Sequence, residues 1–262
     1  MTGRKKGFTL IELLVVISII ALLMSILMPA LSRVKKQAQS VACMSRLKSW
    51  GLIYKLYTDD YQGSFPLGWA SSDMTQWMVT LRPWYHNEWK MLLCPTATRL
   101  VIGAGDTATW KAWTRNIGGF DYVGSYGNSS WTDNMSGDRG DRKKEWFWKT
   151  TQNIPAASTV PVLGDSTWHD AWPRHTDTPV SSPFAFAYGD QGTNNEMNHF
   201  CIDRHNGWTN MAFADWSVRH VGLKELWTLK WHRAFEINGP WTKAGGATGA
   251  DWPQWLRKYK EY

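Results

Sequence analysis

At 262 residues, the chain is long enough for one sizeable domain with an appendage and too short for two full domains. It carries a net charge of +7, but its 29 basic residues are scattered and fit no recognition motif, so we predict no binding to nucleic acid. The sequence has no Gly-x-Ser-x-Gly elbow, no Gly-x4-Gly-Lys-Ser/Thr loop and no His-Glu-x-x-His helix, and we therefore predict a protein that is not an enzyme.

The first predicted element is an apolar helix over residues 8–31, in which Glu12 is the only charged side chain. A helix of that length measures about 36 Å, which is enough to cross a bilayer core of about 30 Å. A cleaved secretory signal has a shorter apolar core, so we predict a persistent transmembrane helix. Three basic residues lie on each side of the span, so the positive-inside rule does not give its orientation.

Glu12 is the costly residue of this span. A charge inside hydrocarbon costs about 2.5–3.5 kcal/mol on insertion scales, so a carboxylate placed there points to a function. The alternative is a lone carboxylate that extends toward the lipid headgroups, because Glu12 lies about 6 Å from the start of the apolar run.

The stretch GFTLIEL at residues 7–13, preceded by a short basic leader, resembles the processing site of type IV pilins and type II secretion pseudopilins. Pro29 also falls where pilins commonly kink their first helix. The resemblance implies cleavage after Gly7 by a membrane-embedded prepilin peptidase, and methylation of the new N-terminal residue, Phe8. It also implies that the Phe8 ammonium of one subunit pairs with Glu12 of the next, which makes both buried charges tolerable and fixes the register.

The same resemblance implies a structural subunit of a type IV pilus-like or type II secretion pseudopilus filament. Its partners would be copies of itself, other pilin-like subunits, the prepilin peptidase and methylase, an inner-membrane assembly platform and the lipid bilayer. After removal of the leader, residues 1–7, the chain would cross the inner membrane once, with its N-terminus in the cytoplasm. It would then enter a filament in the periplasm or at the cell surface. The alternative is a single-pass envelope protein that binds glycans or proteins and never polymerises.

The helix is predicted to continue over residues 32–60 as an amphipathic segment. Apolar side chains recur there at spacings of three to five residues, at Val34, Ala38, Val41, Ala42, Leu47, Leu52, Ile53 and Leu56. The sequence GSFP at residues 63–66 ends the pattern. We therefore expect one long helix, half in the membrane and half packed on a globular head.

Residues 61–262 are predicted to form this head, outside the cytoplasm and rich in β-strands. The fold class expected is α+β: the long helix packed on a small antiparallel sheet with long loops rich in Trp and Gly. Segments 103–145 and 165–198 are longer than ordinary connections, so we interpret them as functional loops or packed excursions. The 19 tryptophans favour either plain packing or, where exposed, stacking on sugars or partner proteins.

Two features of the head predict particular strands. Residues 159–163 have the composition of a short buried strand that ends at Gly164-Asp165. Residues 210–214 and 217–221 flank Asp215-Trp216, which predicts a hairpin with a two-residue turn.

His205 and Asp215 carry a second resemblance. Nine residues separate them, as in pilin-like families that have His, nine residues and then Asp-Gly, but this chain has Trp216 in place of the glycine. A hairpin turn generally needs a positive φ there. We expect His205 and Asp215 to support the shape of the head, by a hydrogen bond across the hairpin, rather than to do chemistry.

Three cysteines, Cys43, Cys94 and Cys201, leave at least one unpaired in any disulfide scheme. Outside the cytoplasm oxidation is allowed, so Cys43 and Cys94 could form a disulfide that clamps the helix to the head. Three buried thiols are an equal alternative.

His199, Cys201, Asp203 and His205 alternate and could hold a metal on one face of a strand. A polar strand edge explains them as well, because alternation does not establish four-ligand geometry, and we predict no metal site. No cofactor is predicted, although calcium in the loop over residues 189–203 is a possibility because some pseudopilins bind it in loops.

Overall fold

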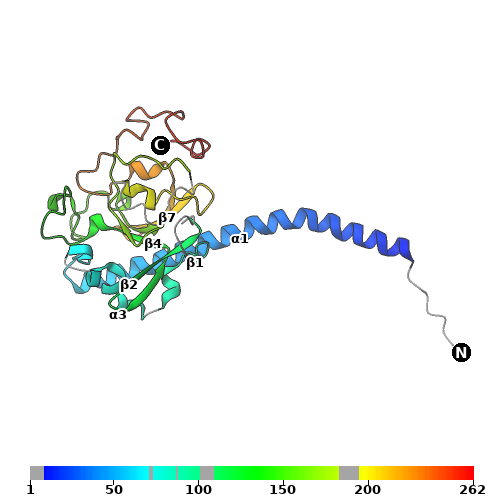
Figure 1. Cartoon of the computed structure of the whole chain (residues 1–262), viewed down its shortest axis with the longest axis horizontal. Coiled ribbons are helices and arrows are strands. Elements are labelled where there is room, and N and C mark those ends of the chain that lie inside the picture. Colours follow the sequence, from blue (N-terminus) through cyan, green and yellow to red (C-terminus); the bar gives the residue numbers. More distant parts are fainter. Residues whose placement is uncertain (1–8, 71–72, 87, 101–108, 183–194) are drawn as a thin grey trace. The chain divides into compact units, whose positions relative to one another are not determined.

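The computed structural model describes residues 9–70, 73–86, 88–100, 109–182 and 195–262 (Figure 1). The chain divides into two compact units, Met1–Gln39 and Ser40–Tyr262, and we call the second the globular unit. The globular unit begins ahead of the predicted head because it includes the last turns of the long helix α1, Leu10–Asp60. The predicted α+β class is confirmed, with one long helix and small, mainly antiparallel sheets.

The N-terminal part of α1 is long and apolar enough to cross a membrane. Its large apolar side chains, from Leu10 to Leu31, are exposed in the single chain. The hydroxyls of Ser18 and Ser25 donate to the carbonyl oxygens of residues three positions earlier, so they present no unpaired polar group to lipid. Pro29 lies inside the helix, where it removes one helical hydrogen bond without ending the element.

Within the globular unit, α1 buries a stripe of side chains spaced by three or four residues, made up of Cys43, Leu47, Trp50, Tyr54 and Tyr57. The predicted apolar face is wrong at Val41, Leu52 and Leu56, which are more than half exposed (54%, 51% and 55%). The buried stripe consists mainly of aromatic residues and a cysteine. Leu47 and Ile53 of the predicted pattern are buried as expected, but the aliphatic residues alone do not define the buried face, because aromatic residues supply most of it.

The larger sheet of the globular unit has five strands in the order β6-β4-β5-β7-β8. They are β4 Tyr126–Ser129, β5 Pro161–Asp165, β6 Asp170–Ala171, β7 Trp208–Phe213 and β8 Val218–Gly222. Strand β5 is buried along its whole length and pairs antiparallel with β4 and β7. This confirms the buried strand that the sequence predicts before Gly164-Asp165.

The smaller sheet has three strands, β1 Arg99–Leu100, β2 Lys111–Ile117 and β3 Phe120–Gly124. Strands β2, β3 and β4 lie in segment 103–145, for which the sequence predicted a functional loop or a packed excursion rather than strands. The remaining elements are short, namely α2 Trp77–Thr80, α3 Arg82–Tyr85, η1 Gly68–Ala70, η2 Asp73–Thr75, η3 Trp89–Leu92, η4 Ser130–Thr132, η5 Lys144–Trp146, η6 Ala157–Thr159, η7 Glu196–His199 and η8 Glu225–Thr228.

The predicted hairpin is formed by β7 and β8, but its loop has three residues rather than two. The Phe213 amide donates to the Ser217 carbonyl at 2.9 Å, and the Trp216 amide donates to the Phe213 carbonyl at 2.8 Å. Trp216 has φ of +64°, the left-handed conformation that ends such three-residue loops and usually selects glycine.

Trp216 keeps this conformation because its side chain packs on the helix. The indole stacks on Tyr54 with 6.3 Å between ring centroids and approaches Phe65 at the same distance. Lys48 donates from Nζ to the Trp216 carbonyl at 2.8 Å. The indole of this left-handed residue thus packs the hairpin against α1, a contact that a glycine would lack.

Most tryptophans of the globular unit are part of its packing, and their indole N–H groups tie irregular segments together. Trp50 donates to the Met91 carbonyl at 2.7 Å, Trp148 to the Trp231 carbonyl at 2.9 Å, and Trp227 to the Asp177 carbonyl at 2.8 Å. Each bond satisfies a carbonyl that lies outside the strands. Trp89, Trp110 and Trp208 are exposed by 56%, 41% and 40%.

Candidate functional site

Glu12 is the third residue of α1, and its carboxylate closes a capping box with Thr9. The Thr9 amide and the Thr9 hydroxyl both donate to Glu12 Oε2 at 2.8 Å, and the Glu12 amide donates to Thr9 Oγ1 at 3.3 Å. This reciprocal arrangement satisfies amides at the start of the helix that have no helical partner. Glu12 is therefore not a lone carboxylate even in the single chain.

The sequence signal for this cap is Thr-x-x-Glu in front of an apolar run, which the sequence analysis did not use. Gly7 and Phe8, the residues predicted for cleavage and methylation, lie outside the described residues. Both assignments stay predictions.

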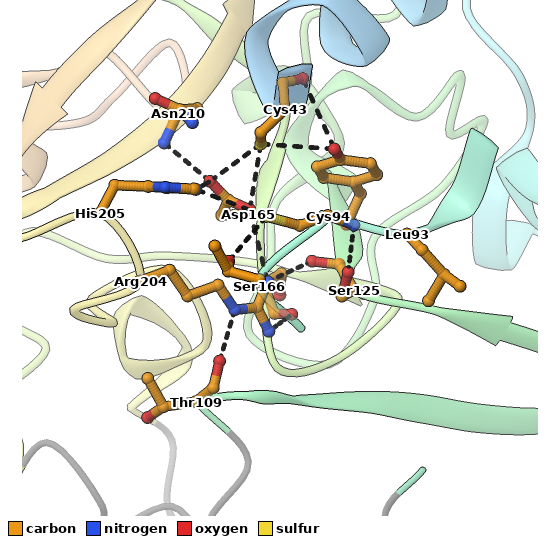
Figure 2. A network of polar contacts seen from close by, with 12 residues as sticks. Cys43, Leu93, Cys94, Thr109, Ser125, Asp165, Ser166, Arg204, His205 and Asn210 are labelled. Carbon is orange, nitrogen blue, oxygen red and sulfur yellow. Dashed lines mark hydrogen bonds and ion pairs between the residues drawn. The ribbon is translucent and has the colours of Figure 1, made fainter. Parts of the chain in front are cut away.

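A second candidate site lies in the globular unit, where four side chains from distant segments converge (Figure 2). Cys43 belongs to α1, Cys94 follows η3, Asp165 is the last residue of β5, and His205 precedes β7. One sulfur, oxygen or nitrogen atom from each of these side chains lies within 4.8 Å of the corresponding atoms of the others. Cys43, Cys94 and Asp165 are fully buried, and His205 is 8% exposed.

The individual distances describe a tight cluster. Cys43 Sγ lies 3.5 Å from each carboxylate oxygen of Asp165. His205 Nε2 lies 3.1 Å from Asp165 Oδ2 and 3.4 Å from Cys94 Sγ. Figure 2 shows the carboxylate of Asp165 between the side chains of Cys43 and Arg204.

Arg204 fixes one side of the cluster. Its buried guanidinium donates to the carbonyl oxygens of Thr109, Lys111, Ser125 and Ser166, and Nη1 lies 3.5 Å from Asp165 Oδ1. The Asn210 amide donates to Asp165 Oδ2 at 3.0 Å. These contacts hold the carboxylate in a single orientation.

The cluster is strongly polarised. Burial alone would raise the pKa of Asp165, but the charges of His205 and Arg204 lower that pKa to about 2. Burial alone would lower the pKa of His205, but the carboxylate of Asp165 raises it to about 10. Burial and the neighbouring Cys94 raise the pKa of Cys43 well above its usual range. The arrangement keeps a carboxylate, an imidazolium and two cysteine sulfurs in mutual contact away from solvent.

The predicted pairing of His205 with Asp215 is wrong. His205 contacts Asp165, whereas Asp215 is exposed and its Oδ1 accepts hydrogen bonds from the amide and hydroxyl of Ser217 at 2.9 and 2.6 Å. His205 lies before β7 and cannot pair across the hairpin turn. Asp215 stabilises that turn, and His205 holds the buried cluster.

The structure brings Cys43 and Cys94 into one cluster, and both cysteines are free and buried, in line with the alternative of three buried thiols rather than with the possible disulfide. Cys201 is also free and buried, and its sulfur contacts the Leu223 carbonyl at 3.9 Å. Of the alternating residues considered for a metal, only His205 belongs to the cluster. Asp203 accepts hydrogen bonds from the Gly207 amide and the Tyr259 hydroxyl.

Asp165 is the site residue that the sequence analysis missed. The available signal was an acidic residue directly after a buried strand, at Gly164-Asp165. The calcium possibility at residues 189–203 lies partly outside the described residues, because residues 189–194 are not described.

Comparison with known proteins identifies the N-terminal segment. Residues 2–28 match the family described as the prokaryotic N-terminal methylation motif. No curated protein and no solved structure matches the chain. The matched residues include the Thr9–Glu12 capping box and lead into the apolar part of α1. The chain therefore carries a prepilin-type N-terminal methylation motif on a long apolar helix, in agreement with a type IV pilin-like protein.

Proposed function

We propose that this chain is a structural, non-enzymatic subunit of a type IV pilus-like filament or a type II secretion pseudopilus. It is made as a prepilin, cleaved after Gly7, methylated at Phe8 and polymerised through α1. The observation that carries the proposal is the methylation motif at residues 2–28, followed by a helix whose apolar side chains are exposed in the single chain. Such a helix needs lipid around it first and, after assembly, the helices of other subunits.

In this proposal, Glu12 links the precursor to the filament. Cleavage after Gly7 converts the Phe8 amide into an ammonium group, next to the capping residue Thr9. Both Thr9 donors bind Glu12 Oε2, which leaves Oε1 for an ammonium group of a neighbouring subunit. In this proposal the carboxylate caps its own helix in the membrane and pairs with the next subunit during assembly.

The proposed location follows from the same helix. The precursor sits in the inner membrane with its N-terminus in the cytoplasm and its globular unit outside, where an assembly platform extracts it into the filament. The apolar segment and the methylation motif support this location.

One observation favours the second candidate, a single-pass binding protein that does not polymerise. A hollow of about 240 Å³ is lined by Tyr85, Trp89, Leu92, Phe120, Asp121, Tyr122 and Val123. Trp89 and Phe120 are exposed, as a stacking platform for a sugar requires. The first candidate has the more specific support, because the methylation motif combines a defined cleavage position with an adjacent helix.

Two substitutions at Glu12 test the assembly step. Glu12→Gln keeps a side chain that can close the capping box but removes the charge, whereas Glu12→Val removes both. We expect both variants to insert in the membrane and to be cleaved, and neither to enter filaments. An unpaired Phe8 ammonium would be buried with each added subunit, and broken buried pairs cost about 3–5 kcal/mol.

The readout is the amount of protein in membrane and sheared-filament fractions. Thr9→Ala is the matched control, because it weakens the cap and keeps the charge, and it should still polymerise. Filaments of Glu12→Gln at normal yield would show that capping, and not charge pairing, is the role of Glu12. Absence of filaments from the wild type would favour the second candidate.

A further inference from the structure

We propose that Cys43, Cys94, Asp165 and His205 bind one zinc ion, which links α1 to the β-rich part of the globular unit. From the sequence we predicted no metal site, because the alternation of His199, Cys201, Asp203 and His205 does not establish four-ligand geometry. The four-ligand set instead comes from four segments that the fold brings together.

The geometry of the cluster matches tetrahedral zinc. Zinc binds sulfur at about 2.3 Å and imidazole nitrogen or carboxylate oxygen at about 2.0–2.2 Å. In a tetrahedron these bonds place a sulfur about 3.6 Å from an oxygen or nitrogen ligand, and a nitrogen about 3.4 Å from an oxygen. The corresponding separations are 3.5 Å for Cys43 and Asp165, 3.4 Å for Cys94 and His205, and 3.1 Å for His205 and Asp165.

The donor set also selects the metal. Two sulfurs, one imidazole nitrogen and one carboxylate oxygen make a mixed soft and hard set, which suits Zn²⁺ better than Ca²⁺ or Mg²⁺. All four ligands come from the protein, and the cluster is buried, which is the pattern of a closed structural site. We therefore assign this zinc a structural role.

The surroundings balance the charge of the complex. Two thiolates and one carboxylate carry three negative charges, and the zinc ion supplies two positive charges. The buried guanidinium of Arg204, 3.5 Å from Asp165 Oδ1, supplies the third. A charge-neutral assembly of this kind can be buried without a large electrostatic penalty.

The groups around the ligands orient them as outer-shell partners do in zinc sites. Tyr126 places its hydroxyl 3.3 Å from Cys43 Sγ, and Thr96 places its hydroxyl 3.0 Å from Cys94 Sγ. The Cys94 amide donates to Ser125 Oγ at 2.6 Å. Each sulfur therefore already has a polar neighbour that fixes its position.

The test measures the metal content of the full-length protein, purified in detergent under reducing conditions after incubation with zinc sulfate. We expect about one zinc per chain in the wild type and less than about a tenth in Cys94→Ser and His205→Gln. Cys201→Ser is the matched control, because Cys201 is also a buried free thiol but lies outside the cluster, and it should bind as much zinc as the wild type.

Two measurements on the wild type keep the proposal testable if the variants fail to fold. Removal of zinc by a chelator should lower the melting temperature, and added zinc should restore it. Cobalt in place of zinc should give the absorption of a tetrahedral site with thiolate ligands. Wild-type protein without zinc, or a mass from the native envelope that is two hydrogens lower because of a Cys43–Cys94 disulfide, would overturn the proposal. Equal zinc loss in Cys201→Ser would overturn it too.

Discussion

His232 shows how a single buried group sets the response of the globular unit to pH. Its imidazole lies 4.3 Å from Trp131 and 5.4 Å from Trp146, measured between ring centroids. Burial, together with the positive charges of His175 and Lys230, lowers its pKa from 6.5 to about 3. The folded state therefore keeps His232 neutral, whereas the unfolded chain takes up a proton below pH 6.5.

This difference predicts a loss of stability in acid. The contribution of neutral His232 is complete above pH 6.5 and is lost as the pH falls toward about 3. Between pH 7.5 and pH 5, the wild type should lose about 2 kcal/mol more unfolding free energy than His232→Phe, in which the group cannot be protonated. Urea unfolding of both proteins at the two pH values measures this difference in unfolding free energy. Equal losses would show that His232 is protonated in the folded state.

At the level of secondary-structure elements, Trp216 fixes how the β7–β8 hairpin packs on α1. Its φ of +64° costs about 1–2 kcal/mol for a residue with a side chain, and Trp216→Gly removes that strain. It also removes the indole that stacks on Tyr54 and contacts Phe65. Removing a fully buried large aromatic side chain costs about 3–5 kcal/mol, and removing a partly buried one costs less. We therefore expect Trp216→Gly to lower the unfolding free energy by about 1–2 kcal/mol in total.

Ala156 provides the matched control. It has φ of +50° and is exposed, so Ala156→Gly removes similar strain with no packing to lose, and should stabilise the protein by up to about 1 kcal/mol. Thermal unfolding of both variants gives the comparison. If Trp216→Gly were as stabilising as Ala156→Gly, the packing of Trp216 on α1 would have no energetic value.

Elements with a strong local pattern could be predicted from the sequence. The long helix, strand β5 and the hairpin around Asp215 follow from apolar runs and turn residues that lie close together in the chain. Strands β2 and β3 could not be predicted, because their polar and aromatic residues break the alternation that indicates a strand. The sequence predicted a two-residue turn at Trp216, whereas the loop has three residues. The left-handed conformation of Trp216 is stabilised by tertiary contacts with α1, which local sequence preference does not reveal.

The two candidate sites also differ in how far local sequence predicts them. The motif at residues 7–13 is local, so the sequence was sufficient to predict it. Asp165 and His205 become partners only when β5 and the segment before β7 fold together, and sequence spacing instead suggested Asp215 as the partner. From the sequence, Cys43 and Cys94 were considered as neighbours only in a possible disulfide. The sequence shows that the chain has thiols, but it does not show which groups surround them in the fold.

At the scale of the whole molecule, we propose that the chain is processed as a pilin-like subunit. The methylation motif at residues 2–28 supports this proposal, and the proposed assembly would cover the exposed apolar side chains of α1. Processing should depend on Gly7, because the peptidase must admit backbone without a side chain beside the scissile bond. Gly7→Val should therefore leave an uncleaved precursor in the membrane, whereas Gly3→Val, a matched change within the leader, should mature normally.

The proposed processing is tested by the mass of the N-terminal peptide of the wild-type protein, isolated from the envelope of its own cells. We expect a peptide that begins at Phe8 and carries one additional methyl group, with the same peptide from Gly3→Val and none from Gly7→Val. A peptide that retains residues 1–7 in the wild type, or one that begins after the apolar segment, would contradict processing as a pilin.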